Sequence, residues 1–337
     1  MPVLVMKATE GFADRMTYLS NCIHYCINFN TYLCVDWSDL VWGGEQFDFH
    51  DVFELIGVKT MTKEQVVKLM VSRKVKVNPP CWTAEDVWKP ITQETWGDEY
   101  AGDFFASDLT SQTKIEGDVL VTNGKGVRSW YSETLLNHMR IRPEVSERIR
   151  VLLKDFNSES LVVHLRGTDR YDEEFCSNVI KTVVQFPEDL PVYVVTDSVK
   201  LYEEFISAVP RGKLVNPRGE VMKLPKNLSR GTHQVSVAVL NKLNCSKFQL
   251  VIDLLVDFIA IWSAKISLGY KESFFYKLAR DYAKQRPELL EKFVGFTPCK
   301  PPSHPHDHAS SPSYQHQPCV PKLHPENEEE QKECLAQ

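Results

Sequence analysis

The sequence has little of what marks several classes of protein. No apolar run approaches the length of a membrane-spanning helix, and the first residues enter an apolar strand pattern, Val3 to Met6, without the basic and apolar segments of a secretory signal. Basic residues are not in excess, because 39 Lys and Arg face 45 Asp and Glu, which gives a formal charge of −6. We therefore expect no transmembrane segment and no nucleic-acid partner.

Cysteine is present in an odd number, nine, and several of these residues fall inside apolar helical or strand patterns. This usage indicates reduced thiols and a cytoplasmic location rather than a disulfide framework. Cys22 and Cys26 are one helical turn apart, but His24 points to another face, so we expect core side chains rather than a metal pair.

Strands alternate with helices along both halves of the chain, which predicts an α/β protein with parallel, doubly wound sheets. The length of 337 residues favours two domains, and we place their boundary near Phe156. The expected domains are 1–156 and 157–296. The expected strands lie at 3–6, 32–36, 118–122, 161–163, 192–197, 213–215 and 265–269, and the main helices at 143–156, 173–184, 198–209, 246–262 and from 273 onward.

The composition changes sharply after Phe296. Residues 297–337 are rich in Pro, His and Glu and poor in apolar side chains, so they are predicted to be a disordered tail. The last four residues, Cys334 to Gln337, match a prenylation box, but the residues before them are acidic rather than basic. A weak association with membranes is expected only if Cys334 is prenylated.

Most of the candidate functional residues lie in one stretch, Ser158 to Glu174. The apolar run of this stretch ends in His164, Arg166, Asp169 and Arg170, at the sheet edge where open α/β folds bind ligands. A guanidinium at that edge suits a phosphate or diphosphate. The alternative is a plain turn, in which Asp169 caps the following helix and Arg166 pairs with a nearby acid.

The first predicted strand also leads into a glycine turn and a helix, through Gly11, Phe12, Asp14 and Arg15. Such a turn brings backbone N–H groups and a helix N-terminus close to a bound anion. A plain connection between strand and helix explains a single glycine equally well.

These motifs resemble those of the GDP-fucose-dependent fucosyltransferases, the superfamily of α1,6, α1,2 and protein O-fucosyltransferases. His164 to Arg170 is similar to the His-x-Arg-Arg-Thr-Asp-Lys motif, Gly11 to Arg15 to the first glycine loop, Tyr193 to Asp197 to the strand ending in Thr-Asp, and Asp257 to Ala279 to the last block. The resemblance covers about the first forty residues and most of 161–279. It implies a GT-B fold, with two Rossmann-like domains facing across a cleft.

The resemblance also implies a donor site. Domain 157–296 would bind GDP-fucose, Arg166 would hold the β-phosphate, and His164 would approach the guanine, mainly through its backbone. Asp257 would accept hydrogen bonds from the guanine, with Asp253 as the competing choice. Other donor-binding groups would come from Ser273 and Phe274 at a helix start and from the first loop, Gly11, Phe12, Asp14 and Arg15.

The acceptor would bind mainly to domain 1–156, and its hydroxyl needs a base. Glu174 stands where α1,6 enzymes carry a carboxylate, with Asp169 and Arg170 beside it as further catalytic candidates. Asp172 or Glu173 could replace Glu174 as the base, and the three acids could also be no more than the negative start of a helix. Asp197 and Asp172 are expected on the acceptor side. Gly167 replaces the second Arg of the α1,6 pattern, which leaves the subclass open.

No Asp-x-Asp triplet, the usual metal-binding element for a sugar diphosphate, occurs in the chain. We therefore expect no metal and no other cofactor. The predicted activity is an inverting, metal-independent transfer of fucose from GDP-fucose to a hydroxyl of a glycan or glycoprotein. The alternatives are a transferase of the same fold that uses another nucleotide sugar, and a non-catalytic module that binds glycans or nucleotides.

Overall fold

The computed structural model describes residues 2–7, 11–37, 48–72, 75–78, 109, 114–123, 132–167, 172–216, 246–285 and 288–297. Residues 298–337 of the predicted tail, Asp169, Arg170 and the whole tryptophan-containing segment 79–108 lie outside these residues. Within them, no helix is both long and apolar enough to cross a membrane.

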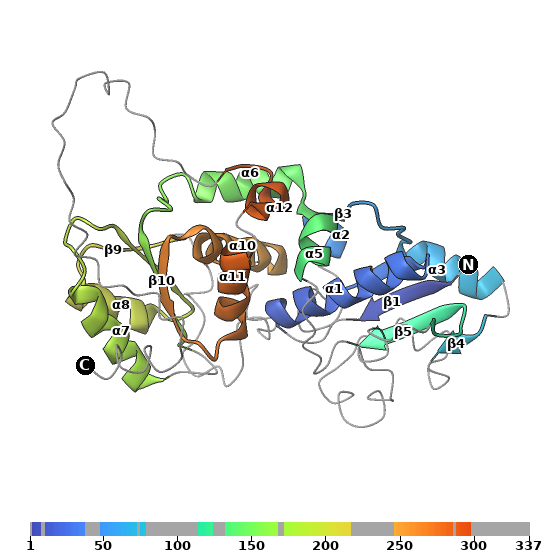
Figure 1. Cartoon of the computed structure of the whole chain (residues 1–337), viewed down its shortest axis with the longest axis horizontal. Coiled ribbons are helices and arrows are strands. Elements are labelled where there is room, and N and C mark those ends of the chain that lie inside the picture. The colour runs from blue at the N-terminus through green and yellow to red at the C-terminus, as the bar shows by residue number, and fades with distance from the viewer. Residues whose placement is uncertain are drawn as a thin grey trace, which may run out of the picture.

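The described chain forms two four-stranded parallel sheets, which confirms the predicted α/β class. The first sheet has the order β2-β1-β5-β4 and the second the order β10-β7-β8-β9. They lie toward opposite ends of the long axis in Figure 1. Their strands are β1 Val3–Lys7, β2 Tyr32–Asp36, β4 Val77–Asn78, β5 Val119–Asn123, β7 Leu161–Leu165, β8 Val192–Thr196, β9 Gly212–Leu214 and β10 Ile266–Gly269.

Central strands of both sheets are buried along their whole length, as expected for parallel sheets covered by helices. The helices are α1 Phe12–Asn28, α2 Phe49–Val52, α3 Lys63–Ser72, α5 Ser132–His138, α6 Pro143–Leu152, α7 Glu173–Val184, α8 Val199–Ala208, α10 Lys247–Ser263, α11 Phe274–Gln285 and α12 Leu289–Val294. The helix predicted to run from Pro143 to Phe156 ends at Leu152, because the chain turns at residues 153–155.

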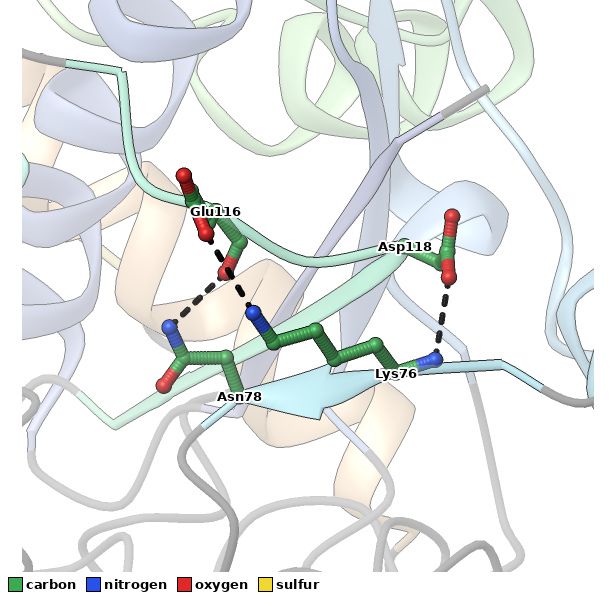
Figure 2. Close-up of polar contacts among 4 residues, drawn as sticks. All are labelled: Lys76, Asn78, Glu116 and Asp118. Carbon is green, nitrogen blue, oxygen red and sulfur yellow. Dashed lines mark hydrogen bonds and ion pairs between the residues drawn. The ribbon is translucent and has the colours of Figure 1, made fainter.

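One short pair of strands was not predicted. Strands β3 Phe53–Leu55 and β6 Met139–Ile141 pair antiparallel, with Phe53 opposite Ile141. Polar contacts join the edge strand β4 to the residues that precede its neighbour β5 (Figure 2). There the Lys76 N–H donates to the Asp118 carboxylate at 2.9 Å, and the Asn78 amide donates to the Glu116 carbonyl at 2.9 Å.

The largest apolar core joins elements from both halves of the chain. Helix α1 supplies Phe12, whose ring meets those of Phe258 on α10 and Phe275 on α11 at centroid distances of 5.6 and 6.3 Å. The same core takes in buried side chains of α5, α6 and α12. Helices α10 and α11 accordingly lie between the two sheets in Figure 1. A separate core fills the space between β7, β8 and helices α7 and α8.

Candidate functional site

The candidate site begins where three neighbouring strands end. In the second sheet Leu165 is opposite Thr196 and His164 is opposite Gly269, so β7, β8 and β10 reach the same edge. Arg166 and Asp197 are the first residues beyond β7 and β8. The sheet therefore places a cation and an anion side by side at the edge where parallel sheets bind ligands.

Arg166 is held by Asp197. Its Nε lies 3.5 Å from Asp197 Oδ2, and the other carboxylate oxygen, Oδ1, accepts the Gly167 N–H at 2.6 Å. The Arg166 side chain is 19 % exposed and that of Asp197 is 8 % exposed. A guanidinium held in this way keeps some access to solvent, so an anion can approach it.

Gly167 packs directly against the start of α8. A Cβ at this position would lie 2.3 Å from the Ser198 Cβ and 2.9 Å from the Leu201 Cδ1. Both distances are shorter than van der Waals contact, so the loop has no room for a side chain here. The fold thus explains why glycine stands where the α1,6 motif has its second arginine.

His164 is enclosed between the sheet and α11. It is 4 % exposed, and its ring stacks on Tyr276 with a centroid distance of 5.6 Å and an interplanar angle of 15°. Burial, assisted by the positive charge of Arg166, lowers the pKa of His164 to about 3. Its Nδ1 has no hydrogen-bond partner among the described residues. The side chain is therefore a neutral packing group that ties β7 to α11.

The turn between β10 and α11 carries Ser273. This residue is buried, its N–H donates to the Tyr270 carbonyl at 2.9 Å, and its carbonyl accepts the Lys277 N–H at 2.9 Å. Ser273 therefore begins the helix, and the half-buried Phe274 is the first residue of its first turn. Because β10 is the parallel neighbour of β7, the chain leaves β10 toward this helix start at the same edge of the sheet where it leaves β7 toward Arg166.

Helix α10 brings two aspartates to the site, one turn apart. Asp253 is buried and accepts hydrogen bonds from the amides of Asn216 at 2.7 Å and Gln249 at 2.8 Å. Asp257, in contrast, has no hydrogen bond or ion pair with any described residue. Burial, and then the negative charges of Asp253 and Asp197, raise the pKa of Asp257 well above its ordinary value. Asp253 is thus satisfied by two amides, whereas the Asp257 carboxyl has no such partner among the described residues.

The start of α1 contributes mainly packing. Gly11 is its N-cap in an extended conformation, Phe12 is buried in the shared core, and Asp14 is half-buried in the first turn. Arg15 is 1 % exposed, with its guanidinium 5.5 Å from the centre of the Trp37 ring. These contacts bring the first loop against α10 and α11, which come from the other half of the chain.

The three acids that follow the motif, Asp172, Glu173 and Glu174, differ in their surroundings. Asp172 caps α7 by accepting the Phe175 N–H at 2.9 Å, while Glu173 and Glu174 are exposed in the first turn of that helix. Asp169 and Arg170 lie outside the described residues. In the part of the chain that the structure describes, no three His, Cys, Asp or Glu side chains form a group able to hold a metal ion.

Two of these features could have been found in the sequence. The partnership of Arg166 with Asp197 follows from the pairing of β7 with β8, since each residue directly follows its strand. The cap formed by Asp172 follows from an acid three residues before Phe175. The stacking of His164 on Tyr276 has no local signal, because it depends on how α11 packs.

Comparison with known proteins bears on the fold. No family model matches the sequence, and no curated protein sequence matches it. Solved structures do match. The fucosyltransferase NodZ from Bradyrhizobium has a TM-score of 0.58 and 18 % identity over 83 % of this chain and 93 % of its own. NodZ α1,6-fucosyltransferase soaked with GDP-fucose gives 0.57, and its co-crystal with GDP gives 0.58, both at 18 % identity over 83 % of this chain and 92 % of theirs. The chain therefore has the GT-B fold of the NodZ structures.

Proposed function

We propose that the protein is an inverting, metal-independent fucosyltransferase that transfers fucose from GDP-fucose to a hydroxyl of a glycan or glycoprotein. The observation that carries the proposal is the partly exposed guanidinium of Arg166, fixed at the end of β7 beside the strand that leads into α11. The fold is shared with a structure soaked with GDP-fucose, which supports this donor.

The proposed chemistry assigns the positive charge to Arg166 and to the start of α11. As the bond between fucose and the β-phosphate breaks, negative charge grows on the departing GDP, and a fixed guanidinium stabilises that charge. Ser273 and the first N–H groups of α11 add a helix dipole on the same side of the sheet. Asp257 would accept the N–H groups of guanine, which would give its half-buried carboxyl hydrogen-bond partners.

The acceptor hydroxyl must lose a proton as the bond to fucose forms. Asp172 is occupied as the helix cap, whereas Glu173 and Glu174 are exposed in the first turn of α7. We assign this role to Glu174, because it stands where the α1,6 enzymes that the motif resembles carry a carboxylate. Asp169 and Arg170, which lie outside the described residues, stay as further catalytic candidates. Domain 1–156 would supply most of the acceptor surface, and the compartment of the reaction would be the cytoplasm.

The test is release of GDP from GDP-fucose, followed with and without EDTA and compared with GDP-mannose and UDP-sugars. We expect GDP-fucose to be preferred and EDTA to have no effect. Arg166→Ala should weaken GDP binding by about ten- to a hundredfold, as the loss of a charge-assisted contact of about 1.5–3 kcal/mol implies.

A matched control is Arg211, directly before β9 of the same sheet, whose guanidinium donates to the carbonyls of Val183 and Phe186. Arg211→Ala should lower the melting temperature and leave GDP affinity unchanged. Faster turnover of another nucleotide sugar would reassign the donor, and binding of GDP without any transfer across a panel of glycans would indicate a binding module. Equal GDP affinity in wild type and Arg166→Ala would refute the proposed donor site.

A further inference from the structure

Asp197 makes two contacts to the end of β7 that bear on how Arg166 is held. One carboxylate oxygen accepts the Gly167 N–H at 2.6 Å, and the other lies 3.5 Å from Arg166 Nε. A single carboxylate thus fixes both the backbone that follows Arg166 and the guanidinium itself. The Asp197 side chain is only 8 % exposed, so solvent weakens the ion pair less than it would at the surface.

Asp197 is itself set on a rigid element. It follows β8, whose last residue Thr196 is buried and accepts the Ser198 N–H through Oγ1 at 3.2 Å. Ser198 in turn caps α8 by accepting the Leu201 N–H. The carboxylate therefore stands between a buried strand and a capped helix, which leaves it little freedom to swing toward another partner.

We propose that Asp197 is a positioning residue that holds Arg166 in place for the donor diphosphate and does not touch the acceptor. This inference rests on the proposed donor site. Both oxygens of its carboxylate contact the two residues that follow β7, one by a hydrogen bond and the other by an ion pair. A group with this arrangement acts on the donor through Arg166, by limiting the number of orientations that the guanidinium can adopt before the ligand arrives.

The direction in which GDP affinity changes when the Asp197 charge is removed distinguishes a positioning role from a purely electrostatic one. A carboxylate near a diphosphate repels it, so removing the charge of Asp197 would by itself strengthen GDP binding. Loss of positioning weakens GDP binding instead, because the free energy needed to order Arg166 is then subtracted from the binding free energy. Weaker GDP binding after removal of a negative charge is therefore the signature of the positioning role.

The experiment compares wild type, Asp197→Ala, Asp197→Asn, Arg166→Ala and the double variant Arg166→Ala/Asp197→Ala by calorimetric titration with GDP and with guanosine. We expect Asp197→Ala to weaken GDP binding about tenfold or more without weakening guanosine binding, since guanosine has no diphosphate. In the double variant, loss of Asp197 should add almost nothing to loss of Arg166. Asp197→Asn should restore part of the affinity, because its amide oxygen still accepts the Gly167 N–H.

The control is Asp118, a carboxylate that likewise accepts a backbone N–H beside a strand, but at the other sheet (Figure 2). Asp118→Asn should leave both titrations unchanged. Asp197 variants that bind GDP as tightly as wild type, or more tightly, would overturn the positioning role while leaving the donor site intact. A parallel loss of GDP and guanosine binding with a lower melting temperature would also overturn it, in favour of a purely structural role. Wild-type protein that binds no GDP would overturn the donor site and the inference together.

Discussion

The contact between Gly167 and α8 allows a stability prediction to be worked through in detail. A Cβ at residue 167 would lie 2.3 Å from the Ser198 Cβ, whereas ordinary contact begins at 3.4 Å, so Gly167→Ala must displace the loop by about 1.1 Å. Overpacking of this kind costs about 1–3 kcal/mol. The displacement also strains the hydrogen bond from the Gly167 N–H to Asp197, which is charge-assisted and worth about 1.5–3 kcal/mol when intact. We expect a total loss of about 2–4 kcal/mol for Gly167→Ala.

A double-mutant cycle isolates the cause. Ser198→Gly removes the clashing Cβ and, because glycine is an acceptable N-cap, should cost only a few tenths of a kcal/mol alone. Combined with Gly167→Ala it should recover about 1 kcal/mol or more, measured by urea unfolding of the four proteins. Gly167→Arg, which restores the second arginine of the α1,6 motif, should lower both stability and GDP affinity. Wild-type stability in Gly167→Ala, or no recovery in the double variant, would refute this account of the loop.

Two further predictions concern pH. The pKa of Asp257 is raised by burial and by two neighbouring carboxylates, and the N–H groups of guanine favour its ionised form. GDP affinity should therefore increase as the pH rises through that raised pKa. Calorimetry across pH should show this increase in wild type and not in Asp257→Asn, and a flat wild-type profile would contradict it. The pKa of His164 is lowered to about 3, so the unfolded chain takes up the proton first as the pH falls below about 6.5. The contribution of neutral His164 to the free energy of unfolding is complete above that pH and is lost on acidification. The free energy of unfolding should fall by about 2 kcal/mol from pH 7 to pH 5 through this residue. Denaturant unfolding of His164→Gln should lack this part of the slope, and an unchanged slope would show that His164 is not the group responsible.

The regular elements were predictable because the local signals were strong. The runs at Tyr32–Asp36 and Val192–Thr196 are short, apolar and bounded by polar residues, and both are strands as expected. Ahead of α3, Thr62 and Gln65 have the sequence spacing of a capping box, and both hydrogen bonds of the box are present. The end of α6 was misplaced because Leu153 and Phe156 are buried and three residues apart, which continues the helical period after the backbone has turned.

The candidate site was only partly predictable, for a physical reason. Motif residues such as Arg166 were singled out because their chemistry is unusual directly after an apolar strand. The difference between Asp253 and Asp257 was not visible, because it depends on Asn216, which reaches α10 from the end of another strand. The pair β3 and β6 was missed since each strand has only three residues and gains stability from pairing rather than from its own pattern.

The core shared by α1, α5, α6, α10, α11 and α12 sets limits on how this chain can be recombined with others. A chimera in which all residues after Phe156 came from another protein would divide that core. The Phe12 ring would then have to pack against side chains of the other protein. One face of the segment from Leu161 to Leu214 has its own core between β7, β8, α7 and α8. On the other face, Val162, Tyr193 and Val195 belong to the shared core, so a chimera that exchanges this segment must keep those three side chains to preserve the packing on which α1 depends.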